Sequence, residues 1–231
     1  IVDAGNNLYW IGLQDKGFCL YDHTNKNIII PAAASNWKYG QINSLLYTQN
    51  ILWISTQENG FFKYSIQNKK LDSVPLGEAR NNISSLLQDK QGNIWLSSPG
   101  YGLIRTPGET LKLIAIPGNP VFEHVHAILS VRNGDIWLNN YNNELIRLSL
   151  LNGSYQAQII KIPGLTVKTD ITALYQDMFE NIWIGTMGKG LFVLNPYTYA
   201  QRAITENNIF NNAGILSING SGNSVYISSL Q

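Results

Sequence analysis

The sequence has few charged side chains, one cysteine and no long apolar run. Asp, Glu, Lys and Arg make up 13% of the 231 residues, and the formal net charge is +1. This balance gives no basic field that would favour nucleic acid as a partner. The single Cys19 excludes an internal disulfide framework and a multi-cysteine zinc site. The sequence contains no run of 18 apolar residues, which would predict a membrane span. The first ten residues lack the pattern of a signal peptide.

A tryptophan-led segment recurs along the chain at a nearly constant spacing. The position is held by five tryptophans and then one tyrosine: Trp10, Trp53, Trp95, Trp137, Trp183 and Tyr226. The spacings are 43, 42, 42, 46 and 43 residues, and only one of the six tryptophans lies elsewhere. A period near 42 residues is typical of propeller blades or of helical arrays.

The contents of each repeat favour the propeller. Each repeat contains a short apolar segment, a turn, the alternating tryptophan strand, a second turn at a glycine, a third strand such as "GLFVLN", and a fourth, more variable strand. None of them shows helical periodicity. The glycines of "NIWIGTMGKGLFVLN" (181–195) precede a strand, whereas a phosphate-binding loop needs a helix after it. We therefore interpret them as hairpin residues.

The predicted fold is all-β, a propeller of four-stranded antiparallel blades with about five and a half blades in one continuous segment, residues 1–231. The expected blades are 1–31, 41–76, 82–117, 124–163, 170–205 and a partial blade at 214–231. Because a propeller closes with whole blades, we interpret the sequence as a fragment of a longer protein.

Two stretches, "ITALYQDMFENIWIGTMGKGLFVLN" and "ISSLLQDKQGNIWLSSPGYGLIRT", closely resemble the two-component regulator propeller repeat. The copies depart from that pattern at Glu180 in a turn-glycine position, at Glu144 in a hairpin-glycine position and at Tyr226. The resemblance covers essentially the whole chain.

The resemblance implies the periplasmic sensor of a hybrid two-component histidine kinase, or of a related one-component regulator. Such propellers have seven blades, often occur in tandem, and are followed by an immunoglobulin-like domain, a membrane helix and a kinase. The expected ligand is an oligosaccharide, the expected partners are the neighbouring domains of the same receptor and a second copy in a homodimer, and no cofactor or catalysis is expected in this segment.

The repeat alignment also predicts a ring of polar residues. We aligned the copies on the leading aliphatic of the first strand, which in a propeller lines the central channel. The residue before that aliphatic is Gln41, Asn82, His124, Asp170 or Gly214. The residue after it is Asn43, Ser84, His126, Thr172 or Leu216. We expect these polar side chains to line the channel or its rim.

We expect the turns after the tryptophan strands to contribute to the mouth of the same channel. Trp37 lies on a loop entering the second blade and could stack on a sugar face, or could instead cover a blade edge. The candidate ligand-binding residues are Trp37, Tyr39, Gln41, Asn82, Tyr101, His124, His126, Tyr141, Asp170 and Lys189.

The sequence also allows other chemistries. His124 and His126 lie on one face of a strand and could hold a metal if Asp170 supplied a third ligand, or they could be solvated rim residues. Asp89 and Asp177 share one turn position, so capping of the turn explains them before catalysis does. A propeller lyase or glycosidase, or a protein-interaction scaffold, is the alternative to a sensor.

Overall fold

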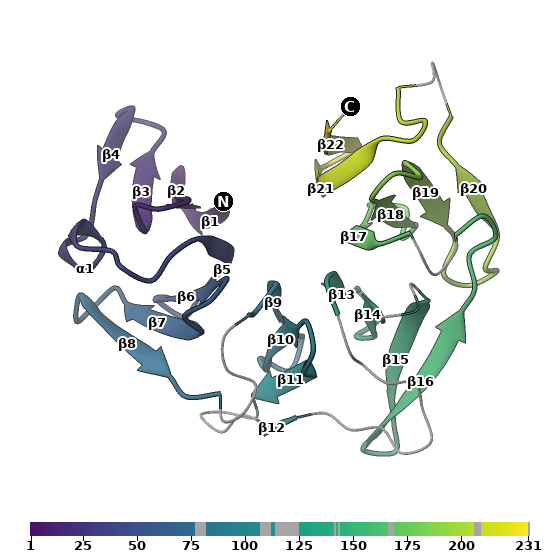
Figure 1. Ribbon diagram of the computed structural model, residues 1–231, viewed down its shortest axis with the longest axis horizontal. Coiled ribbons are helices and arrows are strands. Elements are labelled where there is room, and N and C mark those ends of the chain that lie inside the picture. The colour runs from purple at the N-terminus through teal and green to yellow at the C-terminus, as the bar shows by residue number, and fades with distance from the viewer. Residues whose placement is uncertain are drawn as a thin grey trace.

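The chain forms six β-sheets that are arranged in an open arc (Figure 1). The computed structural model describes residues 1–76, 82–106, 112–113, 125–140, 142, 144–165, 169–205 and 209–230. Five sheets have four strands and the last has two, and neighbours in each sheet are consecutive in the chain. All pairings are antiparallel, which identifies each sheet as a propeller blade.

The blades are numbered 1 to 6 in chain order. Blade 1 contains β1 (Val2–Gly5), β2 (Leu8–Gly12), β3 (Phe18–Asp22) and β4 (Asn27–Ile29). Blade 2 contains β5 (Ile42–Thr48), β6 (Ile51–Thr56), β7 (Phe61–Ser65) and β8 (Lys70–Val74). Blade 3 contains β9 (Ser85–Gln88), β10 (Ile94–Ser98), β11 (Gly102–Thr106) and β12 (Lys112–Leu113).

The remaining three blades repeat this order. Blade 4 contains β13 (Ile128–Ser130), β14 (Ile136–Asn139), β15 (Leu145–Leu151) and β16 (Ser154–Ile160). Blade 5 contains β17 (Ile171–Gln176), β18 (Ile182–Thr186), β19 (Leu191–Leu194) and β20 (Gln201–Ala203). Blade 6 is the hairpin of β21 (Gly214–Ser221) and β22 (Ser224–Leu230).

One helical turn, α1 (Ala32–Ser35), joins blades 1 and 2, although the sequence pattern predicts no helix. A single turn is too short to show helical periodicity, which is why the pattern does not reveal it. The three alanines have the highest helix propensity, and Pro31 precedes them with a φ of −61°.

The hydrophobic cores lie between consecutive blades rather than inside one blade. One cluster joins Trp10 and Phe18 of blade 1 to Leu52 and Phe62 of blade 2, and equivalent clusters occupy the other four boundaries. The leading aliphatics of blades 3 to 6 are fully buried there: Ile83, Val125, Ile171 and Ile215. Each blade therefore completes the core of its neighbour, which explains why the apolar residues repeat with the blade period.

The repeat tryptophans differ in burial, although all five occupy the same position of the repeat. Trp95 and Trp137 are 0% exposed, whereas Trp53 and Trp183 are only half-buried. Trp95 is covered by Tyr155 of the next blade, at a ring distance of 5.2 Å, and by the Arg105 guanidinium. Trp183 faces blade 6, which contributes only two strands.

In blades 3 and 5, an aspartate of the turn before the tryptophan strand accepts a hydrogen bond from the indole N–H. Asp89 accepts a hydrogen bond of 2.7 Å from Trp95 Nε1, and Asp177 accepts one of 2.9 Å from Trp183 Nε1. Both carboxylates also accept bonds from the backbone of their own turns, so they are capping residues. Blade 4 has Val131 at this position, and the buried Nε1 of Trp137 has no partner among the described residues.

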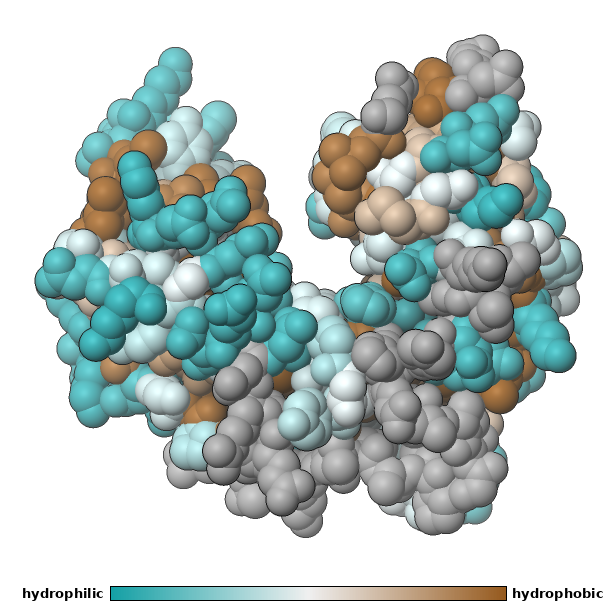
Figure 2. Space-filling view, in the orientation of Figure 1, coloured by the Kyte–Doolittle hydropathy of each residue, from teal (hydrophilic) through white to brown (hydrophobic). Residues whose placement is uncertain are grey.

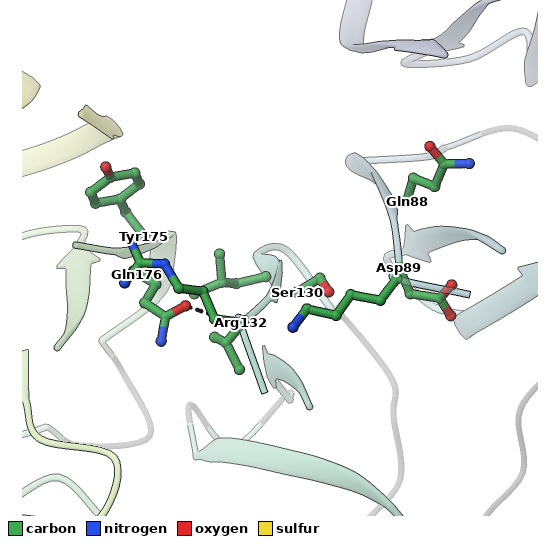
Figure 3. Close-up of a pocket in the computed structure, with 9 residues that line it drawn as sticks. Gln88, Asp89, Ser130, Arg132, Tyr175 and Gln176 are labelled. Carbon is green, nitrogen blue, oxygen red and sulfur yellow. Dashed lines mark hydrogen bonds between the residues drawn. The ribbon is translucent and has the colours of Figure 1, made fainter. Parts of the chain in front are cut away.

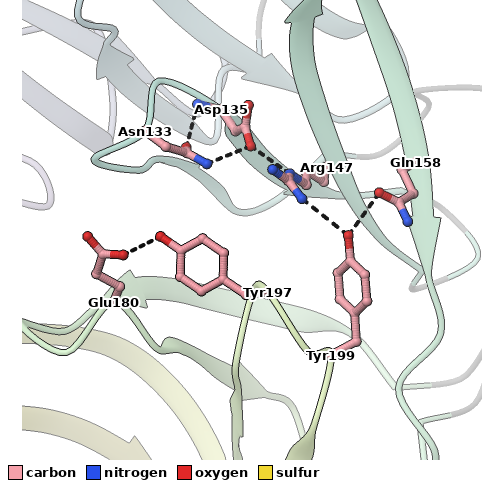
Figure 4. A network of polar contacts seen from close by, with 7 residues as sticks. All are labelled: Asn133, Asp135, Arg147, Gln158, Glu180, Tyr197 and Tyr199. Atoms are coloured by element: carbon pink, nitrogen blue, oxygen red, sulfur yellow. Dashed lines mark hydrogen bonds and ion pairs between the residues drawn. The ribbon is translucent and has the colours of Figure 1, made fainter.

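The outer parts of blades 4 and 5 are joined by a polar network (Figure 4). Arg147 donates to Asp135 at 2.6 Å and to the hydroxyl of Tyr199 at 3.2 Å, and Tyr199 donates to Gln158. Burial opposes the charge of Arg147, but its bonds to Asp135 and Tyr199 outweigh that effect and raise its pKa. Tyr197 of the same loop donates a short hydrogen bond to Glu180.

Turn residues in the left-handed region explain two features of the repeat. Gly190 has a φ of +71°, and a Cβ there would lie 2.0 Å from the carbonyl oxygen of Phe210. Only glycine fits this position, because both the φ and the contact exclude a side chain. Glu180 adopts a φ of +69° where blades 3 and 4 have Gly92 and Gly134, so its turn keeps the glycine conformation with a strained residue.

Candidate functional site

The central hollow is lined by the inner strands of blades 2 to 6. Its volume is about 310 Å3, and its walls include the residues that follow the leading aliphatics of those strands. These equivalent wall residues are Asn43, Ser84, His126, Thr172 and Leu216. In the space-filling view the arc surrounds a deep notch (Figure 2). The structure therefore brings together five residues that are more than 40 positions apart in sequence from one blade to the next.

Three of these side chains donate hydrogen bonds across a blade boundary. Asn43 Nδ2 donates to the carbonyl oxygen of Ile83 at 3.1 Å, and Ser84 Oγ donates to that of Val125 at 2.8 Å. Thr172 Oγ1 donates to the carbonyl oxygen of Ile215. In each case the acceptor is the leading aliphatic of the next blade. The polar repeat position thus ties neighbouring blades together, a role that the sequence alone did not indicate.

These bonds determine what the hollow can offer to a ligand. The Asn43 amide group also donates to Asn82 Oδ1 at 3.4 Å, so its two N–H groups both face protein acceptors. The hydroxyl hydrogens of Ser84 and Thr172 are used in the same way. Carbonyl and hydroxyl oxygens have two lone pairs each, so acceptor capacity remains on all three side chains. Ser84 Oγ also lies 2.8 Å from Ser97 Oγ, and this bond uses part of its capacity. These three wall positions therefore offer acceptors rather than donors to a ligand.

Gln41, Asn82 and Asp170 occupy equivalent positions at the starts of their inner strands, and all three are exposed. The carbonyl oxygen of Gln41 accepts a bond from Gln57 N at 3.0 Å, and that of Asp170 accepts one from Met187 N at 2.8 Å. Blade 3 has Pro99 at the donor position, and Pro99 has no N–H. There Ser98 Oγ donates to Asn82 O at 2.9 Å instead.

The aromatic loop residues Trp37 and Tyr39 pack against the boundary of blades 1 and 2. The Trp37 indole contacts Phe18 at a ring distance of 5.9 Å, and its N–H donates to Gly40 O at 2.7 Å. It also lies so close to Gly17 that a Cβ at that position would overlap the indole. Tyr39 lies 4.5 Å from Phe62, ring to ring. Both rings are half-buried, which supports the blade-edge interpretation of Trp37 over a stacking surface for sugar.

The other predicted mouth residues lie on exposed turns or outside the described part. Tyr101 is 50% exposed between β10 and β11, and Lys189 is exposed between β18 and β19. Neither lines the central hollow. His124 and Tyr141 lie outside the described residues. Within the described ranges, no three His, Cys, Asp or Glu side chains group as metal ligands, and no helix is long and apolar enough to cross a membrane.

The opposite end of the inner strands holds two glutamines that were not among the sequence candidates (Figure 3). Gln88 Oε1 accepts a bond from Thr48 Oγ1 of blade 2, and Gln176 Oε1 accepts one from Arg132 N of blade 4. Each Nε2 bonds a carbonyl of its own turn. They line a depression of about 400 Å3 together with Lys90 and Arg132. Gln88 and Gln176 are equally spaced from the repeat tryptophans of their blades, and this spacing is the feature of the sequence that could have identified them.

The antiparallel blades and their shared cores define a β-propeller. Residues 77–100 match the family described as two component regulator propeller. The matched segment lies in the third of the equivalent repeats. Among curated proteins no sequence matches this chain.

Solved structures share the fold at low sequence identity. The extracellular domain of the hybrid two component system BT4673 from B. thetaiotaomicron is 19% identical, with a TM-score of 0.80 over 99% of this chain and 31% of that chain. The extracellular domain of BT3049 from the same organism is 16% identical, with a TM-score of 0.73 and the same coverage. This chain thus spans about a third of those domains. A streptogramin B lyase is 14% identical, with a TM-score of 0.74 over 98% of this chain and 74% of that chain.

Proposed function

We propose that this propeller is part of the extracytoplasmic sensor of a hybrid two-component system and binds a neutral, hydroxyl-rich ligand such as an oligosaccharide in its central hollow. The observation that carries the proposal is the acceptor-rich ring of Asn43, Ser84 and Thr172, with His126 on the same wall. Sugar hydroxyls donate hydrogen bonds to such acceptors. The likeness to the extracellular domains of two hybrid two component systems of B. thetaiotaomicron supports the sensor role.

The inter-blade bonds also suggest how binding could be signalled. The side chains that would meet the ligand are the same ones that join blades 2 to 3, 3 to 4 and 5 to 6. A ligand that bonds several blades at once favours one arrangement of the blades over others. Such a shift could pass to neighbouring domains of the receptor and, through them, to a kinase that controls gene expression.

A non-catalytic role fits the chemistry of the described wall. The hollow is lined by amide, hydroxyl, imidazole and aliphatic side chains, and none of its described lining residues is Asp or Glu. A glycosidase-type mechanism needs two carboxyl groups across the substrate. The likeness to a streptogramin B lyase concerns the fold, and no described feature of this wall favours that activity.

The test is a thermal-shift screen of the complete extracellular region against neutral oligosaccharides. We expect a saturable shift with at least one saccharide, and loss of that shift in His126→Ala, because His126 is exposed on the wall. Gln67→Ala, in an exposed turn of blade 2, is the control and should keep the shift. Equal shifts in both variants would place the ligand outside this hollow.

A further inference from the structure

A second cleft, of about 430 Å3, lies between blades 2 and 3 and shares no lining residue with the central hollow. Its apolar part includes Trp53 and Ile94, and its polar part includes Lys63, Gln49, Gln88 and Thr106. The volume is within the range of small-molecule sites, and the mixture of an aromatic ring with a few polar groups is typical of them. None of these residues was among the candidates from the sequence.

The indole of Trp53 is stacked on its own blade and remains accessible. Its ring stacks on Phe61 at a centroid distance of 5.2 Å and an interplanar angle of 13°, so one face is fixed against the blade. The equivalent Trp95 is completely buried, because Tyr155 and Arg105 cover it. Trp53 is only half-buried and lines the cleft. The fold therefore presents one repeat tryptophan as a surface for a flat ligand.

The indole N–H of Trp53 is a donor for which the described residues provide no acceptor. In blades 3 and 5 an aspartate six positions earlier accepts this bond. Blade 2 has Tyr47 at that position, and the Tyr47 hydroxyl donates to Asn50 Oδ1 at 3.1 Å. A ligand oxygen in the cleft can accept the bond that a protein carboxylate accepts in the other blades.

Lys63 adds a positive charge to the same surface. It lies directly opposite Trp53 in the β6–β7 pairing and opposite Asp72 in the β7–β8 pairing. Asp72 already forms an ion pair of 2.7 Å with Lys70. Lys63 has no ion-pair partner among the described residues, which leaves a positive charge beside the cleft and favours an anionic group on its occupant.

We propose that the cleft between blades 2 and 3 binds an acidic sugar unit, with the ring on Trp53, the carboxylate at Lys63 and the hydroxyls at Gln49 and Gln88. A sugar ring combines an apolar face with acceptor oxygens, and a carboxylate matches the unshared charge. This site is independent of the central hollow and of the neutral ligand proposed there. It would let the same propeller respond to a second saccharide.

The experiment is a titration of the chain with D-glucuronate, and with D-glucose as its neutral counterpart, followed through the Nε1–H resonances of the six tryptophans. The Trp53 resonance is identified by its absence in Trp53→Phe. We expect glucuronate to shift that resonance saturably and to leave those of Trp95 and Trp137 unchanged, since both are buried. Glucose should bind at least about tenfold more weakly, because it lacks the charged group.

Two matched pairs of variants complete the test. Lys63→Gln should weaken glucuronate binding about tenfold, whereas Lys69→Gln, in the exposed turn before β8 and outside the lining of the cleft, should not. Trp53→Phe should weaken binding about fivefold through loss of the N–H donor, and Trp183→Phe should leave it unchanged. Binding to the Trp53→Phe variant is followed by calorimetry, since that variant lacks the reporting resonance.

The resonances of Trp95 and Trp137 report whether each variant is folded, because both indoles are buried between blades. Equal affinity for glucose and glucuronate, or unchanged binding in a folded Lys63→Gln variant, would overturn the proposal. Neither result would bear on the central hollow, because the two sites share no lining residue.

Discussion

The hydroxyl of Ser84 in blade 3 donates a hydrogen bond of 2.8 Å to the carbonyl oxygen of Val125 in blade 4. The same relationship joins Asn43 to Ile83 and Thr172 to Ile215. Val125, Ile83 and Ile215 are themselves fully buried in the cores between blades. Two adjacent positions of the repeat therefore supply the contacts across these boundaries. The leading aliphatic supplies the apolar contact, and the residue after it supplies the polar one. A ligand in the hollow would contact the residues that join the blades.

The inter-blade bonds should contribute measurably to stability. Thr172→Val keeps the shape of the side chain but removes the donor to Ile215 O, which leaves a carbonyl without that partner. We expect the free energy of unfolding to fall by about 1 kcal/mol, as for a typical hydrogen bond. Urea denaturation measures this change. Thr205→Val, at an exposed position after β20, is the control, and an equal effect there would contradict a special role for Thr172.

The two fully buried tryptophans should respond differently to phenylalanine. In Trp95→Phe the Asp89 carboxylate loses a buried donor, whereas in Trp137→Phe the change removes an N–H that has no partner among the described residues. We expect Trp95→Phe to destabilise the fold by about 1–3 kcal/mol more than Trp137→Phe. Both lose a similar apolar area, so the difference isolates the hydrogen bond. Equal losses in denaturation experiments would show that the Asp89 contact contributes little.

Gly190 and Gly188 provide a matched test of the hairpin turn. Both have positive φ, at +71° and +87°, but a Cβ at Gly188 would meet nothing within 4 Å. Gly188→Ala should cost about 1–2 kcal/mol from backbone strain alone. Gly190→Ala should cost about 1–3 kcal/mol more, because its Cβ would overlap the Phe210 carbonyl. Similar melting temperatures for the two variants would argue against that close contact.

The fold was predictable from the sequence because each blade repeats the same local signals. The spaced tryptophans, hairpin glycines and leading aliphatics all report on one supersecondary unit, so an error in one copy is corrected by the others. Glu180 illustrates this point, since its turn adopts the glycine conformation without a glycine. The helix α1 was missed because one turn carries no period.

The site was less predictable because the sequence shows residue types and spacing but not which groups are already bonded. Asn43, Ser84 and Thr172 were expected to line the channel, and the structure shows that their donors bond the next blade. Trp37 was a candidate for stacking, but it packs on Phe18. Trp53 had the same signature as the other repeat tryptophans. Its accessibility depends on what the next blade places over it, which is a tertiary property.

The central claim, that a saccharide occupies the hollow, is tested most directly by cysteine protection. The one natural thiol, Cys19, is buried, and burial raises its pKa, so it should react slowly with maleimide. Leu216→Cys places a second thiol on the wall of the hollow without removing a hydrogen-bonding side chain, and Gln67→Cys places one on an exposed outer turn. With the saccharide that gives the largest thermal shift, labelling at position 216 should slow as the site fills, while labelling at position 67 should not change. Undiminished labelling at position 216 at saturating saccharide would contradict the account.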